Sequence, residues 1–313
     1  GPNGGGKTNL LNAIHFVGCV GLSNFFDPTE LFSESCPFEA SKTTGSDVIS
    51  VSAFFVSDAY EIGYAFKAKM VNGSVPSMMP ENALYDRQFL VASLLEENIV
   101  FRRKGESDFH DLLSRNERGK IEGEAFSNLN ITSDAFSLAP TISALSYIIK
   151  TFYNPQNVQS NEGLMVLFDL WKSLSGIVTL SPTPTVMILE PFAQTVIGAS
   201  SELVKELNDC GIAVSNLFIQ KNKAGIYDVF LERKNDSGGS FLINMDNESS
   251  GTKKTFEILV TLLLARENPT IFIADDLDAF LHPKLTRYLI SYFTSPANQN
   301  NQLIFNSHDI LNM

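Results

Sequence analysis

The sequence predicts an α/β fold, and three stretches carry that prediction. A glycine-rich loop at residues 1–8 runs straight into an apolar helical pattern. The continuous apolar run Ile271–Ala274 ends in two carboxylates, and such a run suits a buried parallel strand. A second apolar run, "NQLIF", follows and ends in "NSHD". Buried parallel strands that alternate with helices are typical of α/β domains.

The opening stretch "GPNGGGKT" has the spacing of a phosphate-binding loop. Its glycines let the backbone turn several N–H groups toward one anion, and the following helix adds its positive N-terminal end. Lys7 would reach the β- and γ-phosphates, and the Thr8 hydroxyl would bind magnesium. A glycine-rich turn before an ordinary helix is the alternative. The loop alone predicts binding of a nucleoside triphosphate, not the class of enzyme that uses it.

Carboxylates follow the apolar run Ile271–Ala274. Asp275, at the carboxyl end of the expected strand, is placed to hold magnesium, and Asp276 is placed to polarise an attacking water. Asp278 follows in the next turn. An acidic loop after a core strand is the alternative, and it loses weight because the same chain carries a phosphate-binding loop.

Two further patterns could contact phosphate. His308, at the end of the second apolar strand, could donate to a γ-phosphate as a neutral imidazole, although a lone histidine is more often structural. The segment "NESSGTKK" puts Ser250 and Gly251 at the start of an amphipathic helix. Backbone N–H groups at such a terminus can bind an anion, or a serine can simply cap the helix.

Composition limits the possible functions. The chain has 313 residues, 44% of them hydrophobic, which is enough for a large core or two lobes. No apolar stretch approaches the roughly 18 residues of a membrane span, so no membrane partner is expected. Three scattered cysteines match no metal or disulfide spacing and favour a reducing, cytoplasmic location. A net charge of −12 disfavours a broad basic face for nucleic acid. The densest basic spot, Arg102–Lys104, is more simply a solvated hairpin end.

The remaining elements follow from hydrophobic periodicity. Residues 200–211 should form an amphipathic helix that ends at Gly211, a C′ glycine. Residues 107–175 are expected to be mainly helical. Strands are expected at 48–56, 60–70, 98–105 and 176–180, and in a strand-rich patch at 217–246.

The order "GPNGGGKT", "ESSGTKK", "IADDLDAFLHP", "FNSHD" resembles the ABC/SMC-type ATPases, and among them the bacterial AAA-type ATPase group of anti-phage (abortive-infection) defence systems. The resemblance covers both ends of the chain well, but it covers the helical middle only weakly. It implies a P-loop ABC-type ATPase head, a mixed sheet plus an antiparallel β subdomain, with a helical insertion. Residues 1–106 and 177–313 would form the head, and residues 107–176 would form the insertion, a lid.

The resemblance also assigns roles to residues. Asp275 would be the Walker B aspartate, Asp278 would lie in the D-loop, and His308 would be the switch histidine. Ser250 and Gly251 would lie in the signature motif, which reads the γ-phosphate bound by a second subunit. The Walker A loop would supply the nucleotide-binding residues Asn3, Gly4, Gly5, Gly6, Lys7, Thr8 and Asn9.

The implied cofactors are ATP and Mg²⁺, and the implied assembly is a head-to-tail ATP sandwich, as a homodimer or higher homo-oligomer. Two departures from the family pattern stand out. Asp276 occupies a position that is usually Glu, so its carboxylate sits roughly 1.5 Å shorter, and hydrolysis is expected to be slow. Thr252 replaces the second glycine of the signature.

The predicted function is an ATP-hydrolysing switch that controls a protein effector, a nuclease or toxin, in phage defence. A DNA-repair or DNA-tethering ATPase is one alternative, disfavoured by the missing coiled coil and the acidic charge. A transporter's nucleotide-binding subunit is another, disfavoured by the helical insertion and the atypical signature. A GTPase is disfavoured because Gly225 stands where an N-K-x-D loop needs aspartate. No strand precedes Gly1, so the chain is expected to be a fragment that continues beyond both Gly1 and Met313.

Overall fold

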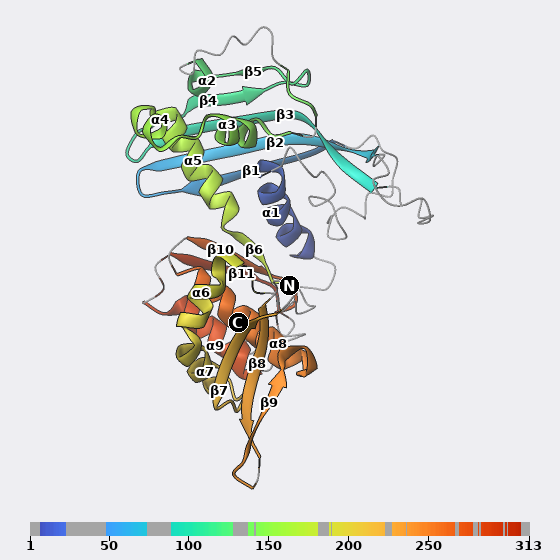
Figure 1. The fold of residues 1–313 in the computed structure, drawn as a ribbon. Coiled ribbons are helices and arrows are strands. Elements are labelled where there is room, and N and C mark those ends of the chain that lie inside the picture. Colours follow the sequence, from blue (N-terminus) through green and yellow to red (C-terminus); the bar gives the residue numbers. More distant parts are fainter. Residues whose placement is uncertain are drawn as a thin grey trace. The chain divides into compact units, whose positions relative to one another are not determined.

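The computed structural model describes residues 7–22, 48–73, 89–127, 137–140, 142–180, 188, 190–222, 227–235, 237–266, 269–277, 281, 283–296, 298 and 300–307. The chain divides into two compact units, Gly1–Ser175 and Gly176–Met313, and the ribbon of each can be followed in Figure 1.

The first unit is built on an antiparallel sheet in which neighbouring strands are also neighbours in sequence. Residues of β2 alternate between its two faces, so Ile62, Tyr64 and Phe66 all point into the core. This alternation is the reason that the two longest expected strands are confirmed. The strands are β1 (Val48–Val56), β2 (Tyr60–Gly73), β3 (Phe89–Arg103), β4 (His110–Arg115) and β5 (Ile121–Glu122).

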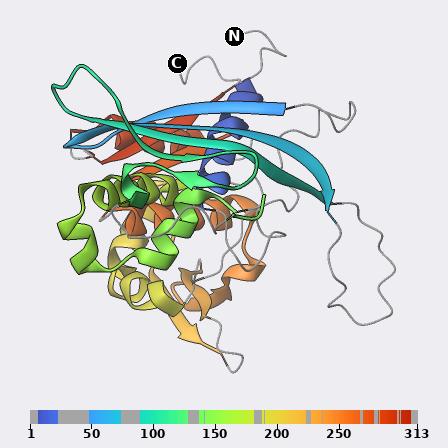
Figure 2. The same ribbon diagram turned by 90° about the horizontal axis from the view of Figure 1, so that it is seen from above.

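Helices of the first unit pack on this sheet, and Figure 2 shows α3–α5 along one of its faces. The ring of Phe16 in α1 meets Phe66 of β2 edge-on, with ring centroids 5.6 Å apart. A Cβ on Gly21, the last residue of α1, would overlap Leu174 of α5. The helices are α1 (Lys7–Gly21), α2 (Glu124–Ser127), α3 (Ala144–Phe152), α4 (Pro155–Ser160) and α5 (Glu162–Ser175).

The helical stretch expected at 107–175 begins later than the periodicity indicates. Residues 110–115 and 121–122 are strands that extend the sheet, and regular helix occurs from Glu124 onward. A turn closed by the Gly119 N–H, which donates to the Asn116 carbonyl at 2.8 Å, folds β5 back on β4. The apolar pair Leu112 and Leu113 fits a helix or a strand equally well, and the turn decides between them.

The second unit has a parallel sheet in the order β11-β10-β6 and an antiparallel sheet in the order β7-β8-β9. Its first strand and helices are β6 (Ile177–Thr179), α6 (Glu190–Gly198) and α7 (Ser200–Asp209). The antiparallel strands are β7 (Asn216–Lys221), β8 (Tyr227–Lys234) and β9 (Ser240–Asn244), followed by a 3₁₀ turn, η2 (Met245–Asn247). The unit continues with α8 (Ser250–Leu264), β10 (Thr270–Ala274), α9 (Pro283–Thr294) and β11 (Asn301–Phe305).

Helix α8 is the centre of the second unit, because it contributes to both of that unit's hydrophobic clusters. Phe256 and Leu259 pack with the side chains of the antiparallel sheet. Ile258 and Leu262 pack with those of the parallel sheet. A helix that is buried on two sides is held in one orientation, so the residues at its N-terminus are presented in a fixed direction.

The end of α7 confirms the expected role of Gly211, whose φ is +89°. Its N–H donates to the Asn208 carbonyl at 2.8 Å, and the Ile212 N–H donates to the Leu207 carbonyl at 2.9 Å. This pair of bonds is the Schellman motif, which requires a left-handed residue at C′.

Candidate functional site

Lys7 and Thr8 form the first turn of α1, directly after the loop residues 1–6, which lie outside the described residues. Lys7 is half-buried and Thr8 is exposed. The first turn of α1 contains no acidic residue, so the positive end of this helix is not neutralised by α1 itself. Asn9 belongs to the same turn. The start of α1 therefore has the electrostatic character that a phosphate group requires.

His15 lies about two helical turns further along α1. Its Nε2 is 3.3 Å from Cys19 Sγ. Burial lowers the pKa of His15, so its ring is neutral near pH 7.

Asp275 and Asp276 of the second unit directly follow β10, as predicted. β10 pairs in parallel with β11 on one side and with β6 on the other, so Asp275 lies at the carboxyl end of the central strand. Asp275 and Asp276 are both half-buried. Ligand-binding residues of open α/β sheets typically lie at this edge.

Asp276 has a left-handed backbone, with φ at +49°. Within the described part of the chain it is the one residue other than glycine with a positive φ. Asp and Asn tolerate this region better than other side chains, yet it costs on the order of 1 kcal/mol. Strain of this kind, at the end of a buried strand, is a marker of functional sites.

Asn306, the residue after β11, makes hydrogen bonds to each of the four residues from Ala274 to Leu277. Its Nδ2 donates to Asp275 Oδ1, and its Oδ1 accepts from the Asp276 N–H. Its own N–H donates to the Ala274 carbonyl at 3.2 Å, and its carbonyl accepts from the Leu277 N–H at 3.0 Å. One asparagine thus fixes both the Asp275 side chain and the backbone turn around Asp276.

The start of α8 combines a serine cap with an exposed turn. Ser249 Oγ accepts from the Thr252 N–H at 3.2 Å, which confirms capping by a serine. Ser250 and Gly251 are exposed. A Cβ built on Gly251 would meet nothing closer than Ser249 Oγ at 3.9 Å. Packing against the described residues therefore does not require a glycine at this position, and a glycine there lowers helix stability.

The segment before α8 is anchored to the antiparallel sheet. Glu248, whose side chain is 7% exposed, accepts from Arg233 Nε at 2.9 Å and from Arg233 Nη2 at 3.0 Å. Lys253 Nζ donates to the Asp246 carbonyl at 2.6 Å. These contacts hold the first turn of α8 in place from both sides.

The predicted site residues that the structure describes are divided between the two units. Asp275, Asp276, Ser250 and Gly251 belong to the second unit, and Lys7 and Thr8 belong to the first. Their predicted roles stay predictions. The predicted Asn3, Gly4, Gly5, Gly6, Asp278 and His308 lie outside the described residues.

Sequence reasoning missed Asn306 and Glu248. Asn306 is inside the quoted "FNSHD", two positions before the histidine, and Glu248 is inside "NESSG". An amide directly after a strand that neighbours a carboxylate-ending strand is a signal that could have identified Asn306.

The donor set fits magnesium better than a transition metal. Within the described ranges, no group of three or more His, Cys, Asp or Glu side chains gathers to hold an ion. Mg²⁺ does not need such a cage, since one or two protein oxygens and the phosphates of a nucleotide complete its shell. In the second unit the Asp275 carboxylate is an oxygen ligand of this kind, and in the first unit the Thr8 hydroxyl is another.

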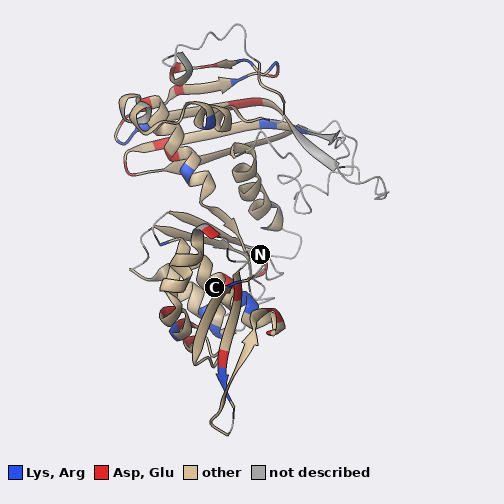
Figure 3. Cartoon of the chain, viewed as in Figure 1, with Lys and Arg blue, Asp and Glu red and all other residues tan. Residues whose placement is uncertain are grey.

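The two arginines of the Arg102–Lys104 patch are both paired with carboxylates. Arg102 donates to Glu61 through Nε at 2.9 Å, and Arg103 donates to Glu162 through Nε at 2.7 Å. Figure 3 shows that Lys and Arg are dispersed among Asp and Glu in both units. Among the described residues, no helix combines the length and apolar content that a membrane crossing needs.

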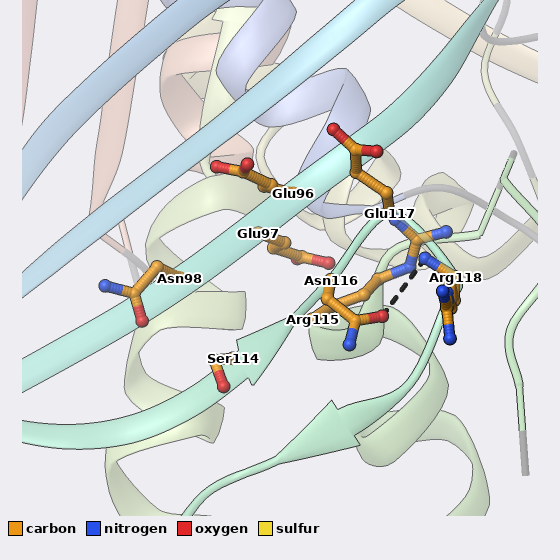
Figure 4. A pocket seen from close by; sticks show the side chains of 8 residues that line it. All are labelled: Glu96, Glu97, Asn98, Ser114, Arg115, Asn116, Glu117 and Arg118. Carbon is orange, nitrogen blue, oxygen red and sulfur yellow. Dashed lines mark hydrogen bonds between the residues drawn. The ribbon is translucent and has the colours of Figure 1, made fainter.

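A polar cavity of about 570 Å³ lies where β3 meets β4 (Figure 4). Glu97 is 2% exposed and accepts from Tyr64 Oη at 3.0 Å, Ser143 Oγ at 2.7 Å and the Ala144 N–H at 2.6 Å. Arg115, equally buried, donates to the Leu94 carbonyl at 2.8 Å. Three carboxylates and two guanidinium groups line this cavity together, so its charge selects no single class of ligand. Its lining residues are Glu96, Glu97, Asn98, Ser114, Arg115, Asn116, Glu117 and Arg118.

Cys210 does not supply a nucleophile. Burial, with nearby Glu206 and Asp209, raises the pKa of its thiol to about 11. At neutral pH the thiolate fraction is therefore negligible.

A match to a protein-family model lies within the second unit. Residues 188–312 match the family model described as "AAA domain, putative AbiEii toxin, Type IV TA system". This match covers less than half of the chain and includes α8, β10 and β11. A comparison with curated proteins found no match.

Among solved structures, the chain is similar to the Smc head domain with an extended coiled coil bound to the C-terminal domain of ScpA, from Pyrococcus furiosus. The identity is 12% and the TM-score is 0.37. The alignment covers 99% of this chain and 83% of that chain.

Proposed function

We propose that this protein binds and hydrolyses ATP with Mg²⁺ and that it works as a molecular switch in the cytoplasm. The observation that carries the proposal is the carboxyl end of β10, where Asp275 is fixed by Asn306 and is followed by Asp276 in a left-handed conformation. The phosphate-loop spacing ahead of α1 adds residues that would bind the phosphates of the nucleotide. The match of residues 188–312 to an AAA domain supports the same class.

The chain's own residues would divide the work as follows. Lys7 and the N-terminus of α1 bind the phosphates, because both carry positive charge toward an anion. Thr8 and Asp275 would hold Mg²⁺, which supplies charge neutralisation of the transferring phosphoryl group. Asp276 orients the attacking water and accepts its proton, and His308 donates to the γ-phosphate.

Hydrolysis is expected to be slow. The Asp276 carboxylate hangs from a side chain one carbon shorter than the Glu usual in the resembled family, and a misplacement on the order of 1 Å can cost about a hundredfold in rate. Slow hydrolysis lengthens the life of the ATP-bound state, which suits a switch better than a motor.

ATP-dependent association of two copies is the second part of the proposal. Ser250 and Gly251 are exposed at the N-terminus of a helix that is buried on two sides, and no described residue crowds Gly251. A glycine that costs helix stability without any internal need suggests close approach by an outside group. The γ-phosphate bound to a second subunit is that group in a head-to-tail sandwich.

Control of a protein effector in phage defence is the remaining part of the proposal. Its support is the description of the matching family, which names a toxin and a type IV TA system. A DNA-tethering ATPase is the alternative, and the carboxylate partners of Arg102 and Arg103 weigh against it. A transporter subunit is a further alternative, which co-purification with membranes would favour.

Calorimetric titration with ATP and MgCl₂ tests the binding step. Lys7→Ala should abolish detectable binding, because Lys7 supplies the full positive charge at the phosphates. Lys205→Ala removes the same charge from exposed α7, where the side chain pairs with Asp209, and should bind as the wild type does. Equal affinity in Lys7→Ala and wild type would remove the nucleotide site from the proposal.

A further inference from the structure

We propose that Asn306 positions the residues that would bind and use magnesium. It fixes the Asp275 carboxylate and holds Asp276 in its left-handed turn. The inference rests on the proposed ATPase function and adds to it a residue on β11 that neither the phosphate loop nor the carboxylate motif contains. Asn306 does not touch the reacting atoms. It acts through its two neighbours on β10.

The two side-chain bonds of Asn306 have opposite polarity, and only a primary amide of this length supplies both. Nδ2 donates to a carboxylate oxygen of Asp275, while Oδ1 accepts from the Asp276 N–H. An aspartate would keep the acceptor but would put a second negative charge against Asp275. A glutamine is one carbon longer, and an alanine makes neither bond.

The backbone of Asn306 makes two further bonds that are independent of its side chain. These join its N–H to Ala274 and its carbonyl to Leu277. Because they fix the main chain of residue 306 on both sides of the turn, a change of side chain removes the amide without releasing the strand. The side chain can therefore be tested separately from the fold.

Each side-chain bond has its own consequence. The bond to Asp275 Oδ1 restricts rotation of that carboxylate, so one orientation of its oxygens is favoured before any cation arrives. This is preorganisation, which removes an ordering cost from binding. The bond to the Asp276 N–H stabilises a backbone conformation that is otherwise unfavourable. Loss of Asn306 should therefore weaken the response to magnesium more than the binding of the nucleotide.

The test separates magnesium from nucleotide. ATP affinity is measured by calorimetry with EDTA, and the MgCl₂ concentration for half-maximal ATP hydrolysis is measured by phosphate release. Asn306→Ala and Asn306→Asp should keep the EDTA affinity within twofold and raise the magnesium midpoint at least tenfold. Gln302→Ala, which removes an exposed amide from the same strand, is the matched control and should behave as the wild type.

A second measurement does not depend on nucleotide. A double-mutant cycle on thermal unfolding pairs Asn306→Ala with Asp275→Ala, without ATP or Mg²⁺. Coupling of at least threefold in the unfolding equilibrium constant supports the side-chain contact, and additive effects overturn it. An unchanged magnesium midpoint in Asn306→Ala also overturns the positioning role, even where the melting temperature falls. A wild type that hydrolyses no ATP, with the coupling still present, would instead overturn the proposed function and leave Asn306 as a structural clamp only.

Discussion

Arg233 and Glu248 form a two-point ion pair, with Nε to Oε1 at 2.9 Å and Nη2 to Oε2 at 3.0 Å. The pair joins β8 to the residue that precedes the cap of α8. Parallel bonds of this kind fix direction as well as distance. The first turn of α8 is therefore oriented by the antiparallel sheet and by its own burial at once.

Removing this pair should loosen the start of α8. Glu248→Gln removes the negative charge from the nearly buried partner of Arg233. We therefore expect the free energy of unfolding to fall by about 1–3 kcal/mol. We also expect weaker ATP-dependent dimerisation. Chemical denaturation and sedimentation measure the two effects. Glu202→Gln, which breaks a more exposed pair with Arg266, is the control and should cost less than about 1 kcal/mol.

Substitutions of Gly251 distinguish a signature motif that contacts a second subunit from a segment that only starts a helix. Gly251→Glu should still bind ATP but should fail to dimerise with a non-hydrolysable ATP analogue, because a carboxylate would face the γ-phosphate. Gly251→Ala should fold at least as stably as the wild type, since the added Cβ has room and alanine favours a helix. Sedimentation of the three proteins decides. Dimerisation of Gly251→Glu at the wild-type level would mean that "ESSGTKK" only starts a helix.

Asp276 offers three substitutions that separate backbone from chemistry. Asp276→Asn keeps the shape and tolerates φ of +49°, so it should fold normally, bind ATP and nearly stop phosphate release. Asp276→Gly should do the same with a relaxed backbone. Asp276→Glu restores the usual longer carboxylate but strains the turn, so we expect a lower melting temperature. Normal hydrolysis by Asp276→Asn would place the base elsewhere.

Glu97 should be the largest single contributor among the buried polar groups of the first unit. Glu97→Ala leaves Tyr64, Ser143 and the start of α3 without their acceptor, and we expect a loss of about 3–5 kcal/mol. Glu96→Ala, next along β3 and in an exposed pair with Lys67, should cost about 1 kcal/mol or less. Urea denaturation of the two variants measures the contrast, and similar losses would contradict the network.

Tyr64 makes the stability of the first unit sensitive to alkaline pH. Burial, followed by the charge of Glu97, raises the pKa of Tyr64 well above its usual value of 10.0. Above pH 10 the unfolded chain loses the phenolic proton and the folded chain keeps it, so stability falls as pH rises. One such group contributes a slope of about 1.4 kcal/mol per pH unit. The unfolded tyrosine is half deprotonated at pH 10, so Tyr64→Phe should reduce the fall between pH 10 and 11 by about 1 kcal/mol, whereas an unchanged fall would exclude Tyr64 as the source.

Local patterns predicted the elements that depend on local chemistry. The apolar run Ile271–Ala274 forms a parallel strand, Gly211 ends a helix, and "ESSG" starts one. Each of these follows from the side chains of a few adjacent residues. Among the predicted site residues, the positions of Asp275 and Asp276 at a strand end followed in the same way.

Contacts between distant residues could not be predicted in this way. Asn306 and Asp275 are 31 positions apart, and their meeting depends on two strands pairing in parallel register. Glu97 and Ala144 are 47 positions apart, and no local pattern around Glu97 indicates that the start of a distant helix covers it. The helix expected at residues 110–115 is a strand, β4, because a turn and not the periodicity decides between the two.

The left-handed backbone at residue 276 also limits how this sequence can change in evolution. Glycine, asparagine and aspartate fit that conformation with little strain, and of the three only aspartate carries a negative charge. A change to glutamate would extend the carboxylate and strain the main chain together. If the proposed function holds, a change toward faster hydrolysis at this position would therefore also strain the β10 turn, so it is favoured only where that turn changes as well.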